Sequence, residues 1–208
     1  MSESSTSLRA AADLPPEEEA RANHYALLAR LLYAPPDAGL LAALAAEDDR
    51  AVEESEGGLA QAWSELKRAA AAADVEAVND EFQSVFVGTG RAEVTPYVSA
   101  YLARTSADMP LVDVRGFLAE KGIARRTTVN EPEDHIALLC ETMRYLILHD
   151  GSLATQRELF ERFIWPATEG LCNAIEGAGH ADFYKWIARL MRAYCDIEHT
   201  SFVMHYNS

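Results

Sequence analysis

The sequence predicts an all-helical (all-α) protein, a single-domain bundle of about nine to ten helices. Hydrophobic residues make up 49% of the 208-residue chain and are concentrated in runs rich in Ala and Leu, which are strong helix formers. There are only 11 glycines and few runs of β-branched residues. No segment shows the alternation of apolar and polar residues that is typical of a half-buried strand.

The chain is long enough to bury one full core, and nothing in it requires a division into two domains. We expect residues 1–14 to be a disordered N-terminus and residues 15–208 to form one helical domain. Eighteen Lys and Arg residues against 33 Asp and Glu residues leave a net charge of −15. Such a surface repels nucleic acid and anionic membranes and attracts basic partners, although acidity can also serve only to keep a protein soluble.

The three cysteines, Cys140, Cys172 and Cys195, are widely spaced and fit neither a disulfide framework nor a zinc signature. Each lies among apolar residues of a predicted helix, so each is expected to be a buried core residue. The N-terminal residues lack a long apolar core, and no apolar run approaches membrane-spanning length. We therefore expect a cytoplasmic protein without stable membrane insertion.

Apolar residues at three- and four-residue spacing predict successive helices in the first part of the chain. The first ends at Tyr33-Ala34-Pro35-Pro36, the acidic segment Glu47–Gly58 is a linker, Asp74 is an N-cap, and Gly88-Thr89-Gly90 ends the last of these helices. Their apolar positions are Leu27, Leu28, Leu31 and Leu32; Leu40, Leu41 and Leu44; Leu59, Trp63 and Leu66; and Val75, Val78, Phe82, Val85 and Phe86.

Two shorter helices are predicted in the middle of the chain. Thr95-Pro96 starts the first, which carries Tyr97, Ser99 and Tyr101. Tyrosines at this spacing are usually core residues with a hydrated hydroxyl. The second begins at Pro110 and is followed by a loop that carries Arg125-Arg126.

The most informative stretch is Asn130–His135 and the helix that follows it to Leu148. Pro132 suits the first turn of this helix, where its missing N–H is no loss. Glu131, Glu133 and Asp134 place negative charge at the positive end of the helix dipole, which is by itself a sufficient structural role. The buried face is predicted to comprise Ile136, Leu139, Cys140, Met143, Leu146 and Ile147.

A long helical pattern covers Leu153–Ile175, in which Trp165-Pro166 should kink or divide the helix. Gly177 and Gly179 separate it from a final helix with a wide apolar face, and the tail His199–Ser208 is weakly patterned.

No nucleophile motif, phosphate-binding loop or redox cysteine pair is present. A metal site is an alternative, because Glu131, Asp134, His135 and Glu141 are suitable ligand types near one helix. Di-iron bundles repeat Glu-x-x-His on separate helices, and this chain has no second copy. His135 could titrate at physiological pH, but a histidine at a helix start is more often a structural residue than a working acid or base. Asp134 and His135 could equally anchor the arginine and backbone of a peptide.

Taken together, these motifs resemble the TorD/DmsD family of redox-enzyme maturation chaperones, relatives of the NarJ-type nitrate reductase chaperones. The similar blocks are Glu81-Phe82-x-x-Val85-Phe86-x-Gly88-x-Gly90 with Pro96-Tyr97-x-Ser99-x-Tyr101; Glu131-Pro132-Glu133-Asp134-His135; and Phe160-x-x-Phe163-x-Trp165-Pro166 with Phe183-Tyr184-Lys185. Separated motifs in the same order are much less frequent by chance than one motif alone.

The resemblance implies a TorD-like helical fold and a protein that binds, without catalysis or cofactor, the twin-arginine signal peptide and apo form of a molybdenum-containing oxidoreductase. It implies that export of that enzyme is delayed until its cofactor is inserted. The family's signal-peptide-binding surface corresponds here to Tyr97, Ser99, Tyr101, Glu131, Pro132, Asp134 and His135.

Alternatives from other classes remain at this point. One is a NarJ-type chaperone of an enzyme without a twin-arginine leader, and another is a small helical metal-binding enzyme. A monomer and a dimer made by helix exchange are both compatible with the sequence.

Overall fold

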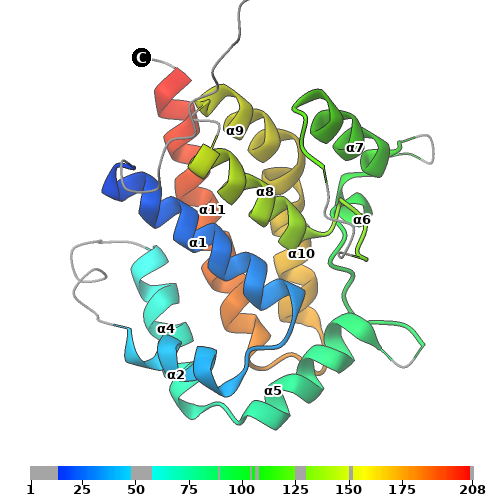
Figure 1. Ribbon diagram of the computed structural model, residues 1–208. Helices are drawn as coiled ribbons and strands as arrows, with labels where there is room; N and C mark the ends of the chain where they lie inside the picture. Colours follow the sequence, from blue (N-terminus) through cyan, green and yellow to red (C-terminus); the bar gives the residue numbers. More distant parts are fainter. Residues whose placement is uncertain are drawn as a thin grey trace, which may run out of the picture.

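The computed structural model confirms the all-helical class (Figure 1). It describes residues 14–47, 58–88, 90–103, 105, 108–124, 130–149 and 152–206. Ten α-helical segments and two π-helical turns lie in these ranges, together with one isolated β-bridge. The expected disordered N-terminus lies, apart from Leu14, outside the described residues, as do residues 48–57 of the acidic linker and Arg125-Arg126.

The helical segments follow the predicted order along the chain. They are α1 (Pro16–Tyr33), α2 (Ala38–Ala46), α4 (Gly58–Ala72), α5 (Val75–Phe82), the π-turn Gln83–Val87, α6 (Ser99–Leu102), α7 (Pro110–Glu120), α8 (Ile136–His149), α9 (Leu153–Leu159), the π-turn Phe160–Ile164, α10 (Trp165–Gly177) and α11 (Tyr184–Tyr206).

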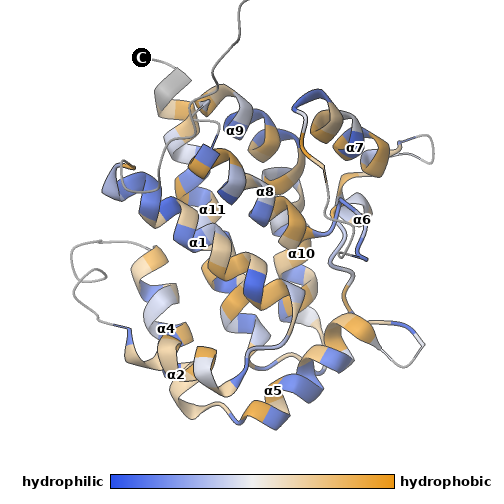
Figure 2. Ribbon diagram, in the orientation of Figure 1, coloured by the Kyte–Doolittle hydropathy of each residue, from blue (hydrophilic) through white to orange (hydrophobic). Residues whose placement is uncertain are grey.

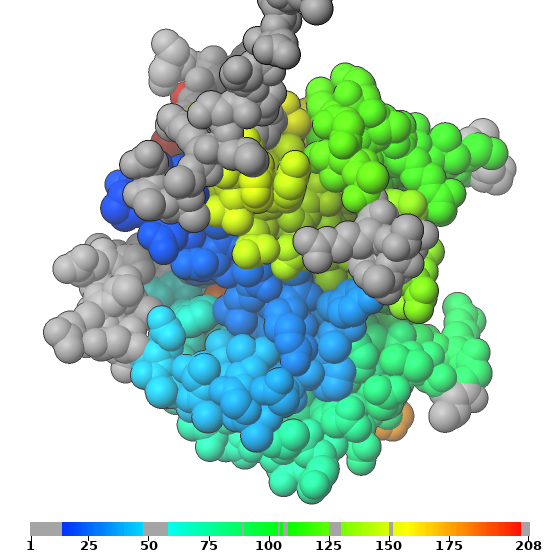
Figure 3. Space-filling model, viewed as in Figure 1, coloured from blue at the N-terminus to red at the C-terminus, as the bar shows by residue number. Residues whose placement is uncertain are grey.

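Helix α8 packs its apolar face into the core. The side chains of Ile136, Leu139 and Met143 are completely buried, as the spacing predicts. Helix α1 packs along α8, and the two lie side by side on one face of the molecule (Figure 3). The first turns of α1 are hydrophilic and its second half is hydrophobic (Figure 2), so the second half supplies most of the contact.

Two expected helix starts are wrong, and both have the same cause. Helix α8 begins at Ile136, so Pro132 lies in the preceding turn, where its carbonyl accepts a 3.1 Å hydrogen bond from the N–H of His135. Helix α6 begins at Ser99, so Tyr97 also precedes its helix. Tyr97 and His135 pair instead in the isolated antiparallel bridge. Because a residue in β-type pairing is extended, each helix starts only after its bridge residue.

The long C-terminal helical region is divided at Trp165-Pro166, as predicted. Pro166 lies in the first turn of α10, where no N–H is needed, and the π-turn Phe160–Ile164 joins α10 to α9. A second π-turn ends α5 before Gly88, which has a φ of 68°. A Cβ atom there would lie 2.5 Å from the carbonyl carbon of Arg91, so only glycine fits this predicted helix end.

Helix α11 is capped by a side chain from another helix. The carboxylate of Glu81 on α5 is mostly buried and accepts hydrogen bonds of 2.7–2.9 Å from three successive backbone N–H groups, those of Asp182, Phe183 and Tyr184. These groups have no partner within the helix itself. The weakly patterned tail continues α11, and Phe202 is buried there against Phe160.

A buried ion pair joins the first and last helices. Arg21 of α1 donates two hydrogen bonds of 2.8 Å to the carboxylate of Glu198 on α11, which also accepts a 3.0 Å bond from the Tyr25 hydroxyl. Removing Arg21 would leave the buried Glu198 carboxylate without its cationic partner, whereas Arg21 is also paired with Glu18 at 2.9 Å. The pair therefore fixes α1, and with it Tyr33 at the end of α1, relative to the bundle.

The cysteine prediction is confirmed: Cys140, Cys172 and Cys195 are buried and free. Burial raises the pKa of the Cys140 and Cys172 thiols to about 12. Within the described ranges, no helix combines the length and hydropathy needed to cross a membrane.

Candidate functional site

The two motifs that carry the predicted site residues are joined by backbone hydrogen bonds. The N–H of Val98 donates to the carbonyl of Asp134, and the N–H of Ile136 donates to the carbonyl of Pro96, each at 2.9 Å. These bonds flank the bridge between Tyr97 and His135. The tyrosine segment (residues 96–101) and the segment 131–135, called here the acidic segment, therefore lie together at the N-terminal end of α8.

Side chains strengthen this junction. The Tyr97 hydroxyl donates a 2.5 Å hydrogen bond to the carboxylate of Glu131. The Tyr97 ring meets the His135 ring edge-to-face, with centroids 5.4 Å apart. Burial and the bond to Glu131 raise the pKa of Tyr97 to about 12, so its hydroxyl stays protonated and acts as a donor.

His135 has a structural role in this conformation. Its side chain is buried, and its Nδ1 accepts a 3.1 Å hydrogen bond from the N–H of Ala137 in the first turn of α8. Burial lowers the pKa of His135, although the charges of Glu131 and Asp134 act in the opposite direction. An accepting Nδ1 requires the neutral ring with its proton on Nε2. The cap of α8 is thus the imidazole of His135.

Asp134 and Ser99 supply polar groups that have no side-chain hydrogen bond within the described residues. The Asp134 side chain is only 4% exposed, and its carboxylate makes no hydrogen bond or ion pair with the described residues. The Oγ atom of Ser99 is buried and has no hydrogen-bond partner. A shielded carboxylate and hydroxyl that lack partners can each accept a hydrogen bond from a bound group.

The other predicted residues lie around this centre. Glu131 and Pro132 are partly exposed at its edge. The Tyr101 hydroxyl donates to the carbonyl of Thr95 at 2.8 Å, and its ring packs against Gly170 of α10. Tyr101 therefore holds the tyrosine segment against α10. Arg115 of α7 forms a 2.8 Å ion pair with Glu133, which holds α7 beside the acidic segment.

The sequence interpretation missed one aromatic residue. Tyr33, interpreted only as part of a helix end, is 44% exposed, and its ring lies edge-on to His135 with centroids 5.8 Å apart. His135 is thus contacted by tyrosines from two distant segments. Hydrophobic spacing cannot reveal this, because the contact depends on how α1 lies against α8.

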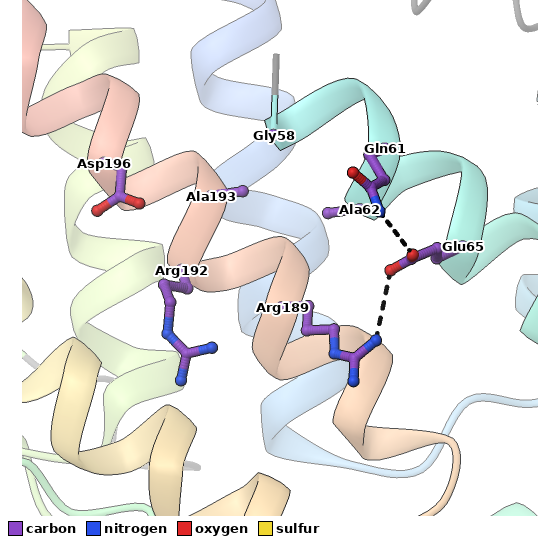
Figure 4. A pocket seen from close by; sticks show the side chains of 8 residues that line it. All are labelled: Gly58, Gln61, Ala62, Glu65, Arg189, Arg192, Ala193 and Asp196. Atoms are coloured by element: carbon purple, nitrogen blue, oxygen red, sulfur yellow. Dashed lines mark hydrogen bonds and ion pairs between the residues drawn. The ribbon is translucent and has the colours of Figure 1, made fainter.

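Two further features lie outside this site. Among the described residues, no three His, Cys, Asp or Glu side chains are grouped as metal ligands. A surface pocket of about 260 Å³ lies between α4 and α11 (Figure 4). Its arginines are already paired: Arg189 with Glu65 and Glu176, and Arg192 with Glu176. None of the predicted site residues lines it.

Comparison with known proteins places these features in a family. Residues 52–173 match the family model described as nitrate reductase delta subunit. The chain is 28% identical over 134 residues to the chaperone protein TorD of Photobacterium profundum. This alignment covers 57% of this chain and 60% of TorD. It is 32% identical over 117 residues to the Tat proofreading chaperone DmsD of Haemophilus influenzae, covering 54% of this chain and 56% of DmsD.

The fold agrees with this assignment. A crystal structure of a redox enzyme maturation protein from Archaeoglobus fulgidus matches 85% of this chain and 93% of its own, with a TM-score of 0.50 and 18% identity. The family match covers both joined motifs and the whole of α8. The chain therefore belongs to the nitrate reductase delta subunit family, the redox-enzyme maturation chaperones that include TorD and DmsD.

Proposed function

We propose that this protein is a cytoplasmic chaperone that binds the twin-arginine signal peptide and apo form of a molybdenum-containing oxidoreductase. Binding would delay export until cofactor insertion and assembly are complete, and it requires no turnover by the chaperone. The names of the TorD and DmsD relatives support a chaperone of this class. The peptide would bind at the junction of Tyr97, Ser99, Glu131, Pro132, Asp134 and His135, with Tyr101 behind it.

The observation that carries this proposal is the carboxylate of Asp134, which is 4% exposed and makes no hydrogen bond or ion pair with the described part of the chain. Holding a carboxylate in a shielded position without a partner costs folding free energy. A guanidinium bound there would offset that cost, because it donates two parallel hydrogen bonds to a carboxylate. The orphaned Ser99 Oγ could accept a further hydrogen bond from the peptide.

The charge of the protein favours the same ligand. The net charge of −15 attracts a basic segment over long range and speeds its encounter with the site. Glu131 and Glu133 lie on the segment that carries Asp134 and are partly exposed. A peptide with an arginine pair followed by apolar residues would therefore find acids and aromatic rings in one place.

Calorimetric titration with twin-arginine leader peptides of molybdoenzymes from the same genome tests the proposal. Wild-type protein should bind a cognate leader, and replacing both peptide arginines by alanine should abolish binding. Asp134→Asn should weaken binding by about 1.5–3 kcal/mol, or about 10- to 150-fold in Kd, since it removes a charge-assisted hydrogen bond. Its thermal stability should be unchanged or higher, because the unpaired charge is removed.

Asp113→Asn is the matched control, because Asp113 is an exposed acid on neighbouring α7. It changes the net charge by the same amount and should leave Kd unchanged. Binding that persists after removal of the peptide arginines would contradict the twin-arginine proposal. It would favour a NarJ-type arrangement, in which another N-terminal segment is recognised, and the family description makes this the second candidate.

A further inference from the structure

Tyr33 lies at the proposed binding site, although it comes from a much earlier part of the sequence. It is the last residue of α1, and its ring contacts the ring of His135, which in turn contacts that of Tyr97. With 44% of its surface exposed, Tyr33 is far more accessible than His135, which is 5% exposed. Nearly half of the Tyr33 surface is thus accessible to a ligand, while the edge-on contact with the imidazole keeps the ring beside His135.

The position of Tyr33 is fixed by the turn that follows it. Arg30, one turn earlier on α1, donates hydrogen bonds to the carbonyls of Ala34 (3.2 Å) and Pro35 (3.1 Å). The same guanidinium forms a 3.4 Å ion pair with Asp37, the N-cap of α2. These bonds hold the backbone on the C-terminal side of Tyr33, while the packing of α1 on α8 holds the other side.

We propose that Tyr33 is the aromatic wall of the site and stacks on the guanidinium that pairs with Asp134. This inference rests on the proposed function and specifies which chemical group the site selects. A guanidinium is planar, so its edge can donate to a carboxylate while its face lies on an aromatic ring. A lysine ammonium is a compact, strongly hydrated point charge and cannot do both equally well. The site would therefore prefer arginine over lysine, and Tyr33 would cause part of that preference.

The test combines substitutions in the protein with substitutions in the peptide. Kd is measured for a leader with two arginines and for the same leader with two lysines, against wild type, Tyr33→Leu and Tyr33→Phe. Tyr33→Leu should raise the Kd of the arginine peptide about 3- to 30-fold and raise the Kd of the lysine peptide by a smaller factor. Tyr33→Phe keeps the ring face and should behave like wild type.

Tyr145→Leu is the matched control. Tyr145 is also an exposed tyrosine, 48% accessible, and also lies against a histidine, His149, with ring centroids 4.5 Å apart. It lies about 2.5 turns further along α8, away from the site. This variant should leave both Kd values unchanged, and thermal melts should show that all three variants fold.

Each outcome separates this inference from the proposed function. Binding that depends on Asp134 but is unchanged in Tyr33→Leu would overturn the role of Tyr33 and leave the proposed function intact. Equal weakening of the arginine and lysine peptides by Tyr33→Leu would also overturn it, because the ring would then contact another part of the peptide. If no twin-arginine leader binds the wild-type protein, both are wrong.

Discussion

The ring of Tyr101 occupies the space that a side chain at Gly170 would fill. A Cβ atom at Gly170 would lie 2.8 Å from Cδ1 of Tyr101, closer than two carbon atoms can approach without movement. The same ring carries the hydroxyl that holds the carbonyl of Thr95, next to the bridge segment. A glycine on α10 thus determines where the tyrosine segment lies.

Gly170→Ala should displace Tyr101 and lower the free energy of unfolding by about 1–3 kcal/mol, as overpacked core sites do. Leader-peptide affinity should also fall, because Ser99 and Tyr97 follow the displaced segment. Denaturant unfolding and titration calorimetry measure the two effects.

Gly116→Ala is the control for this variant. Gly116 lies within α7, and a Cβ there meets no atom within 4 Å. This substitution should stabilise the protein slightly through helix propensity and leave affinity unchanged. If both alanine variants have the same stability, the contact between Gly170 and Tyr101 does not have the proposed effect.

Glu81→Ala should destabilise the protein by about 3 kcal/mol, because it leaves three N–H groups at the start of α11 without an acceptor. Glu81→Gln should lower stability by less, since the amide oxygen of glutamine can still accept a hydrogen bond from these N–H groups. Asp80→Ala, at an exposed neighbouring position on α5, is the control and should lie close to wild type in urea unfolding. A Glu81→Ala midpoint equal to that of Asp80→Ala would refute the capping role.

His135 should make stability depend on pH. Its pKa in the folded protein lies below the ordinary value of 6.5, so the unfolded chain binds the proton first as the pH falls. The contribution of neutral His135 is complete above the unfolded pKa and is lost as the pH falls from there through the folded pKa. His135→Asn keeps an acceptor for the N–H of Ala137 but does not titrate.

Melting temperature should therefore fall less in His135→Asn than in wild type between about pH 7.5 and about pH 5. His149→Asn replaces an exposed histidine on the same helix and should keep the wild-type dependence of melting temperature on pH. Parallel curves for wild type and His135→Asn would show that protonation of His135 does not weaken the fold.

The cysteines should be unreactive in the folded protein. Burial raises the pKa of Cys140 and Cys172 to about 12 and raises that of Cys195 as well, so little thiolate forms at neutral pH. Ellman's reagent should label none of the three at pH 8 in native buffer and all three in guanidinium chloride, without dimer formation. Rapid labelling of native protein would mean that α8, α10 or α11 opens readily.

The all-helical class, the order of the helices and the buried face of α8 follow from the sequence alone. Residues three and four apart share one face of a helix wherever that helix is placed, so Ile136, Leu139 and Met143 could be assigned to the core directly. The helix end at Gly88 and the division at Trp165-Pro166 depend on local backbone restrictions and were equally accessible.

Contacts between segments far apart in the chain were decided by the tertiary structure. Because Tyr97 and His135 pair in a bridge, α6 and α8 begin only after these residues. No local pattern encodes a partner so distant in the sequence. Glu81 belongs to one of the sequence motifs, but its role as the cap of α11 depends on where α5 meets that helix. Tyr33 joins the site because α1 packs along α8. The sequence determines the faces of each helix locally, whereas a site made between helices exists only once those faces have packed.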